Sequence, residues 1–229
     1  MLIAGLQKSS LLDYPEKIAA VVFTCGCNFR CDYCHNPDIL TDFRSDAACD
    51  EQHVLDFLNS RKGKLDAVVV SGGEPTLQKD LPEFFKKIKS RGFLTKLDTN
   101  GTNPDVVKKL VHKGLVDYIA MDIKAPVEKY HLVTNTCTDI EKIKESIDFI
   151  MNCGVDYEFR TTVVKSSLDE KDLENIGKTI KGAKRYYLQK FVATKTLNPA
   201  FAFETTYSTQ EFEHIKSLLL PCVKEVFVR

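Results

Sequence analysis

Short apolar, β-branched runs alternate along this chain with segments whose apolar residues recur at helical spacing. Several runs are almost continuously apolar, as expected of parallel strands that are buried on both faces. This alternation is typical of an α/β fold. The predicted strands cover residues 18–24, 65–71, 93–99, 116–123, 155–164, 185–191 and 223–229.

The segments between these strands carry signals for helix starts and stops. The clearest lies at residues 80–92, where Asp80 and Glu83 form a capping pair, apolar residues recur at helical spacing and Gly92 ends the helix. Asparagine, serine and aspartate caps predict the other helices in the same way. These are expected at residues 103–114, 139–154 and 169–182, and after the pair Ser208 and Glu211.

The number of β-α units limits the architecture. Right-handed β-α units close toward a barrel, and eight of them need about 250 residues. The 229 residues of this chain hold about six. We therefore expect a partial (β/α)6 TIM-like barrel that is open on one side. Because we find no low-complexity linker, we expect a single domain over residues 1–229.

Charge and hydropathy argue against nucleic acid and membranes as partners. Lys plus Arg equals Asp plus Glu at 32 each, so no global basic field exists to hold nucleic acid or an anionic membrane. The longest apolar runs are too short to span a bilayer, and the first residues lack a cleavage pattern. We expect a cytoplasmic protein with no nucleic-acid or membrane partner. In that reducing compartment, clustered cysteines favour a metal or catalytic site over a disulfide.

Four cysteines lie within residues 25–34. Cys27, Cys31 and Cys34 have the spacing C-x3-C-x2-C, which lets three thiolates converge on one soft metal centre. Three thiolates leave one iron of a 4Fe-4S cluster open to a substrate, as a catalytic zinc site keeps one position open. Cys25 could instead supply a fourth thiolate and make a closed zinc or electron-transfer site.

Polar motifs follow the predicted strands at their carboxyl ends, where barrel folds place their chemistry. They are "SGGEP" at 71–75, "DTNG" at 98–101, "DIK" at 122–124 and Arg160. Each motif has a structural alternative: an ordinary turn, a hairpin, a local charge pair and a buried ion pair, respectively. Their shared position favours one functional site.

The spacing C-x3-C-x-aromatic-C with Tyr33, followed by "SGGEP", resembles the radical S-adenosylmethionine superfamily, which has a partial α/β barrel. The resemblance implies that Cys27, Cys31 and Cys34 hold a 4Fe-4S cluster. It also implies that S-adenosylmethionine binds the open iron through its amino and carboxylate groups. One electron then cleaves this cofactor to methionine and a 5'-deoxyadenosyl radical, so the hard chemistry belongs to the cofactors.

The motifs at 98–101 and 122–124 resemble those of activating enzymes for glycyl radical enzymes. By this resemblance, Asp98 and Asp122, with the carbonyls of Thr99 and Ala120, would hold a monovalent cation beside the cofactor carboxylate, and Lys124 would pair with that carboxylate. The implied cofactor-binding residues are Tyr33, Asn36, Ser71, Gly72, Gly73, Glu74, Asp98, Asp122, Lys124 and Arg160.

Residues 13–23, 157–164 and 186–191 resemble one subgroup of these enzymes, the anaerobic ribonucleoside-triphosphate reductase activating proteins. The resemblance implies a glycyl radical enzyme as partner and a flavodoxin or ferredoxin-type protein as electron donor. Cys25 and Glu16 depart from the subgroup's usual residues. Neither departure touches the three expected cluster ligands.

Two other functions stay open on the sequence alone. One is a radical enzyme that acts on a small molecule, like 7-carboxy-7-deazaguanine synthase, and the other is a closed four-cysteine zinc or electron-carrier protein. Phe191 and residues 192–198 should line the substrate mouth, whereas His35 has no assigned role. The remaining thiols are expected to be inert: Cys49, Cys137, Cys153 and Cys222.

Overall fold

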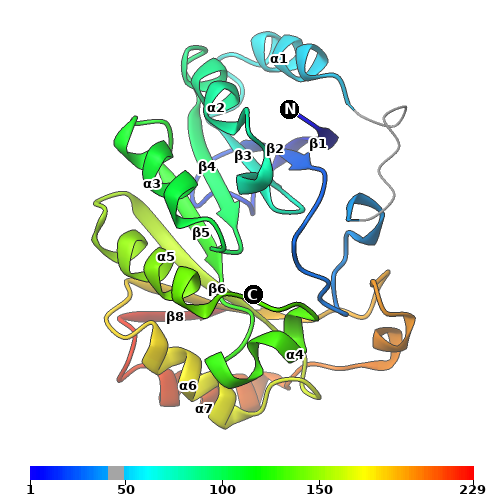
Figure 1. The fold of residues 1–229 in the computed structure, drawn as a ribbon, viewed down its shortest axis with the longest axis vertical. Coiled ribbons are helices and arrows are strands. Elements are labelled where there is room, and N and C mark those ends of the chain that lie inside the picture. Colours follow the sequence, from blue (N-terminus) through cyan, green and yellow to red (C-terminus); the bar gives the residue numbers. More distant parts are fainter. Residues whose placement is uncertain (41–48) are drawn as a thin grey trace. The chain divides into compact units, whose positions relative to one another are not determined.

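A computed structural model describes residues 1–40 and 49–229 of the chain (Figure 1). The strands are β1 (Ile3–Ser10), β2 (Ala19–Thr24), β3 (Ala67–Gly72), β4 (Leu94–Thr99), β5 (Tyr118–Asp122), β6 (Asp156–Val163), β7 (Arg185–Lys190) and β8 (Glu225–Val228). The α-helices are α1 (Glu51–Ser60), α2 (Leu81–Lys89), α3 (Pro104–His112), α4 (Tyr130–Thr134), α5 (Ile140–Asn152), α6 (Glu170–Thr179) and α7 (Thr209–Leu219). Short 3-10 helices cover Pro37–Ile39, Pro75–Leu77, Val127–Lys129 and Pro199–Phe203.

The strand order in the sheet is the order of the chain, from β1 to β8. β1 pairs with β2 in the antiparallel sense, whereas β2, β3 and β4 are parallel, as are β6, β7 and β8. Since β1 and β8 are the two ends of this order, the sheet is open. The prediction of an open, mostly parallel α/β fold is confirmed.

The chain divides into two compact units. Unit 1 comprises Met1–Asn28, Asp38–Thr99 and Asn103–Ile119, and unit 2 comprises Phe29–Pro37, Asn100–Thr102 and Ala120–Arg229. The expectation of one domain over residues 1–229 stays a prediction. In the described part of the chain, the helices are all too short or too polar to cross a bilayer.

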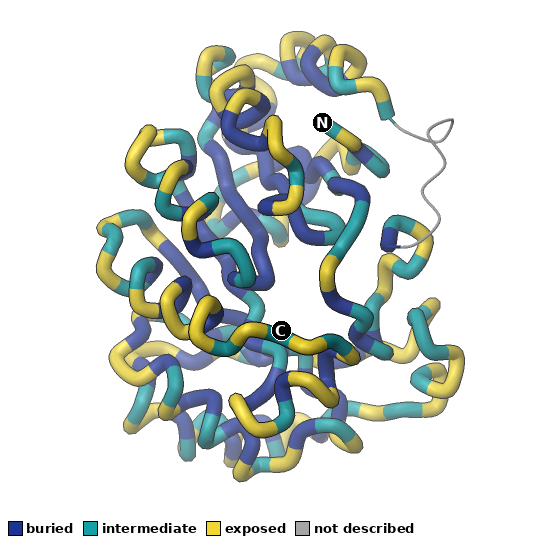
Figure 2. Tube along the Cα trace, viewed as in Figure 1, coloured by how far each residue is buried: buried dark blue, intermediate teal, exposed yellow. Residues whose placement is uncertain are grey.

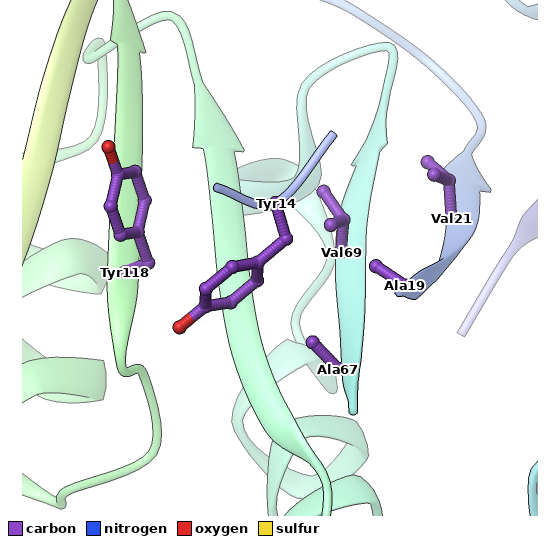
Figure 3. Packing of buried hydrophobic residues seen from close by; sticks show 6 residues of the cluster. All are labelled: Tyr14, Ala19, Val21, Ala67, Val69 and Tyr118. Atoms are coloured by element: carbon purple, nitrogen blue, oxygen red, sulfur yellow. The ribbon is translucent and has the colours of Figure 1, made fainter. Parts of the chain in front are cut away.

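One apolar cluster of unit 1 lies on the sheet face that Tyr14 covers. Alternate residues of β2 and β3 point to this face, because successive side chains of a strand point to opposite sides. Figure 3 shows Tyr14 over the sheet, with Tyr118 of β5 on one side and Val69 of β3 on the other. The ring centroids of the two tyrosines lie 5.5 Å apart. β2, β3 and β4 are almost wholly buried, whereas α1 and α2 expose one side (Figure 2).

Each predicted strand occurs, with ends that shift by at most two residues. β1, α1 and α4 were not predicted. β1 is half exposed and lacks a regular alternation, which explains why its pattern carries little signal. The five predicted helices also occur, and Ser208 and Glu211 form a capping box.

α2 begins after Asp80 as predicted, but the predicted capping bonds of Asp80 and Glu83 are wrong. Asp80 stands at the N-cap of α2, yet within the described chain its side chain makes no bond to the helix backbone. Its carboxylate instead lies 2.5 Å from the Met1 ammonium. The Asp80 carboxylate therefore pairs with the Met1 ammonium and does not bond to the amides of the first turn of α2.

Candidate functional site

The first part of the cysteine loop belongs to unit 1 and is fixed by backbone bonds. The amide of Cys25 donates to the Leu2 carbonyl at 3.1 Å, and the Cys25 carbonyl accepts from Nε2 of Gln78 at 2.8 Å. The Cys25 thiol is buried, and burial raises its pKa to about 11. Burial therefore disfavours the thiolate form of the free thiol.

The glycines of the "SGGEP" turn lie directly on the backbone that follows β2. The Glu74 amide donates to the Gly26 carbonyl at 2.8 Å. A Cβ atom at Gly73 would lie 1.9 Å from the Gly26 oxygen, and one at Gly72 would lie 2.3 Å from the Thr24 nitrogen. The Thr24 hydroxyl also donates to the Ser71 carbonyl. The two glycines are therefore required for this close approach, whatever they do for a cofactor.

Glu74 is buried, with 1% of its surface exposed, and its carboxylate connects this turn to β4. Its Oε1 accepts from the Thr76 amide at 3.1 Å, the Thr76 hydroxyl at 2.5 Å and the Thr99 hydroxyl at 2.8 Å. Through these bonds, Glu74 holds the turn after β3 against the end of β4. Its predicted contact with the cofactor stays a prediction.

Asp98 lies at the carboxyl end of β4 and is buried. The Lys96 ammonium lies 3.3 Å from its Oδ1. The sequence motifs did not include Lys96, although its place two positions before Asp98 puts both side chains on the same face of the strand. Asp98 and Thr99 end β4, and residues 100–103 connect it to α3, so the hairpin alternative is wrong.

The second part of the cysteine loop belongs to unit 2. The carbonyls of Asp32 and Cys34 each accept, at 3.0 Å, from the amides of Asn198 and Leu197, respectively. Residues of the 192–198 segment thus hold the loop from one side. The side chains of His35 and Asn36 are exposed, and the His35 ring lies 5.6 Å from that of Phe191.

Asp122, Lys124 and Arg160 form an ion cluster in unit 2. Oδ2 of Asp122 lies 2.9 Å from the Lys124 ammonium, and Oδ1 accepts from Nε of Arg160 at 2.7 Å. The Ile123 amide donates to the Arg160 carbonyl, which aligns the two segments. Burial opposes ionisation of Asp122, but Arg160 and Lys124 outweigh it and hold the pKa of the carboxyl well below its ordinary value.

Lys124 also lies close to the cysteine loop. Its ammonium lies 5.9 Å from the centroid of the Tyr33 ring. Burial disfavours the charged form, yet the Asp122 carboxylate raises the pKa of Lys124 well above its ordinary value. Burial raises the pKa of Cys31, and the positive charge of Lys124 opposes that rise. The ammonium is therefore a fixed positive charge beside a thiol of the loop.

The predicted site residues thus form two groups, one in each unit. Cys27, Ser71, Gly72, Gly73, Glu74 and Asp98 belong to unit 1, and Cys31, Tyr33, Cys34, Asn36, Asp122, Lys124 and Arg160 belong to unit 2. Among residues 1–40 and 49–229, no three His, Cys, Asp or Glu side chains are arranged as a metal site. The ligand set Cys27, Cys31 and Cys34 stays a prediction. Outside the loop, Cys137 is exposed and Cys49, Cys153 and Cys222 are partly exposed.

The chemistry of these side chains suits an iron–sulfur cluster and an amino-acid cofactor. Thiols are the ligands that iron–sulfur clusters use. The charged groups of the Asp122 cluster are of the kind that binds a carboxylate and an ammonium.

Comparison with known proteins agrees with this chemistry. Residues 21–180 match the Radical SAM superfamily. A protein of Methanocaldococcus jannaschii named "Putative glycyl-radical enzyme activating enzyme" is 40% identical over 196 residues, which cover 83% of this chain and 80% of that protein. The pyruvate formate-lyase-activating enzyme of Listeria monocytogenes is 37% identical over 145 residues, 58% of this chain and 56% of that protein.

Among solved structures, Streptococcus suis SuiB bound to S-adenosylmethionine has the same fold, with a TM-score of 0.69 at 11% identity. The alignment covers 89% of this chain and 48% of SuiB. The chain belongs to the radical S-adenosylmethionine superfamily of enzymes. Within it, the chain is a member of the family of glycyl-radical enzyme activating enzymes. Its cofactors are accordingly a 4Fe-4S cluster and S-adenosylmethionine.

Proposed function

We propose that this enzyme generates a glycyl radical on an anaerobic ribonucleoside-triphosphate reductase. The observation that carries the activase chemistry is the partly buried Lys124 ammonium, held by Asp122 next to Cys31 and Tyr33. The choice of partner rests on the resemblance of residues 13–23, 157–164 and 186–191 to the activating proteins of that reductase.

In this proposal, residues 1–229 act as a single domain, and Cys27, Cys31 and Cys34 hold the cluster. Lys124 binds the cofactor carboxylate, and Asp122 keeps Lys124 charged and correctly placed. Arg160 holds the other oxygen of Asp122, which fixes the carboxylate in one orientation. With one electron, the cluster and cofactor supply a 5'-deoxyadenosyl radical. The further contacts come from Tyr33, Asn36, Ser71, Gly72, Gly73, Glu74 and Asp98.

The proposed compartment and partners follow from the sequence. We propose a cytoplasmic protein that takes electrons from a flavodoxin or ferredoxin-type donor and has no nucleic-acid or membrane partner. The balance of 32 basic and 32 acidic residues supports the absence of a polyanionic partner. Phe191 and residues 192–198 would line the mouth that the glycine enters.

An anaerobic incubation of the reduced protein with the reductase and S-adenosylmethionine tests the proposal. We expect a glycyl radical signal by electron paramagnetic resonance that needs all three components. A pyruvate formate-lyase offered in place of the reductase is the matched control and should give a weaker signal. A radical on the lyase alone would overturn the choice of partner. Cofactor cleavage without a radical on either protein would favour the small-molecule alternative.

A further inference from the structure

Lys96 is a buried cation that none of the expected site motifs includes. It lies in the middle of β4, and 1% of its side chain is exposed. Side chains two positions apart in a strand point to the same face, so Lys96 and Asp98 share the face that Tyr14 covers. The Lys96 ammonium lies 5.5 Å from the centroid of the Tyr118 ring, a neighbour of Tyr14 in Figure 3. It also donates to the carbonyl of Asp13.

An ammonium in such a place is costly unless it is paired and hydrogen-bonded. The Asp98 carboxylate, the Asp13 carbonyl and the face of the Tyr118 ring provide this compensation. A buried ion pair is nevertheless weak as a stabilising device, since apolar residues of similar volume often do as well. A charge at this position is better explained by what it does to Asp98.

We propose that Lys96 is a positioning residue that neutralises Asp98 in place of a bound monovalent cation. The family resemblance assigns such a cation to Asp98, but here a fixed ammonium lies 3.3 Å from the carboxylate. A second cation at the same oxygens would be repelled by the first. Binding of S-adenosylmethionine to this enzyme is therefore independent of potassium and sodium. The inference rests on the proposed place of Asp98 at the cofactor carboxylate.

The test is anaerobic calorimetry of S-adenosylmethionine binding to the cluster-loaded protein. One buffer contains potassium chloride, one contains sodium chloride, and one contains tetramethylammonium chloride at the same ionic strength. For the natural protein we expect affinities that agree within about twofold in the three buffers, below the tenfold that 1.4 kcal/mol represents. An affinity at least tenfold higher with potassium or sodium would overturn the inference. This measurement needs no variant, so it stands even if a variant fails to fold.

The substitution Lys96→Met removes the charge and keeps the length of the side chain. We expect its affinity in tetramethylammonium to fall by roughly tenfold to a hundredfold, the effect of one charge-assisted contact. Potassium or sodium should restore part of this loss, because a small cation can then approach Asp98. Lys89→Met is the matched control, since Lys89 pairs with Asp117 at 2.6 Å in the same unit but is partly exposed. Its affinity should not change.

Two results separate the possible failures. A folded Lys96→Met protein with natural, cation-independent affinity would show that Lys96 serves only the fold, and the inference would be wrong. An Asp98→Asn protein with natural affinity would show that Asp98 does not serve the cofactor, so the inference would lose its basis. The choice of partner is tested separately, because these binding measurements contain no partner protein.

Discussion

At the scale of single residues, the thiols of the cysteine loop differ in their electrostatic surroundings. Burial raises the pKa of Cys25 to about 11. Burial also raises the pKa of Cys31, but there the Lys124 ammonium favours the thiolate. Burial thus disfavours the thiolate at both positions, and a nearby ammonium opposes this effect at Cys31.

Serine substitutions test this difference. We expect Cys25→Ser to keep its iron and its cleavage of S-adenosylmethionine, and Cys31→Ser to lose both, since only Cys31 belongs to the predicted ligand set. Iron content and 5'-deoxyadenosine formation are the measurements. Equal loss in both variants would mean that Cys25 is also a ligand.

The burial of Cys25 and its raised pKa both predict a thiol of low reactivity. A thiol with a pKa of about 11 is only about one-thousandth thiolate at pH 8, and this fraction rises about tenfold for each pH unit up to about pH 10. Alkylation of Cys25 by iodoacetamide should therefore be slow at pH 8 and accelerate steeply with pH. Mass spectrometry of the alkylated peptides gives the rate, with the exposed Cys137 as internal reference. Similar rates for the two thiols at pH 8 would contradict the assignment.

Lys124 is the residue on which the proposed cofactor site depends most. Lys124→Met should weaken S-adenosylmethionine binding by roughly tenfold to a hundredfold, because one charge-assisted contact is worth about 1.5 to 3 kcal/mol. Anaerobic calorimetry measures the affinity, and circular dichroism checks the fold. Lys144→Met is the control, since Lys144 is an exposed lysine paired with Glu141. An unchanged affinity for Lys124→Met would return the 122–124 motif to a local charge pair.

At the scale of elements, the turn after β3 and the loop after β2 form one backbone unit. The Glu74 amide binds the Gly26 carbonyl, and the Gly73 amide binds the Thr24 carbonyl at 3.0 Å. The Glu74 side chain then connects the turn to Thr99 at the end of β4. A backbone shift in the turn would therefore move Thr24 and Gly26, which come just before the predicted ligand Cys27.

Gly73→Ala tests this coupling. Its new Cβ atom would lie 1.9 Å from the Gly26 oxygen, so backbone must move, and overpacking of this kind costs about 1 to 3 kcal/mol. We expect lower stability in chemical denaturation together with lower iron content. Gly5→Ala is the control, because a Cβ atom at Gly5 meets no atom within 4 Å. Normal iron loading of Gly73→Ala would show that the loop tolerates the shift.

At the scale of the whole molecule, the predicted site residues come from distant parts of the chain and from both units. The boundary between the units falls between Cys27 and Cys31, within the cysteine loop. The activase chemistry then requires that the radical reach a glycine of another protein.

Following the abstracted hydrogen atom tests whether the enzyme takes it from the partner's glycine. If the partner's glycine carries deuterium on its alpha carbon, we expect deuterium in the 5'-deoxyadenosine and one radical per activated glycine. The C–D bond breaks, one electron stays on the glycine carbon, and the deuterium atom forms the new bond of 5'-deoxyadenosine. Mass spectrometry of the nucleoside measures the transfer. Partner-dependent cleavage without deuterium transfer would place the abstraction elsewhere.

Local patterns in the sequence determined most of the elements and the chemical class. Runs such as residues 65–71 predict buried strands because β-branched residues suit a sheet covered on both faces. The spacing of Cys27, Cys31 and Cys34 similarly indicates a metal centre, since three nearby thiols in one loop can converge without help from distant residues.

Contacts between distant residues decided the rest. Asp80 was expected to cap α2 but pairs with the Met1 ammonium, because the charge that it meets comes from another segment. Gly73 must be glycine because the Gly26 carbonyl lies against it, which no local pattern reveals. The neighbours of Lys96 are a carboxylate, a carbonyl and an aromatic ring from three segments of unit 1. Sequence spacing reports which face of a strand a residue occupies, but only tertiary packing determines what that face meets.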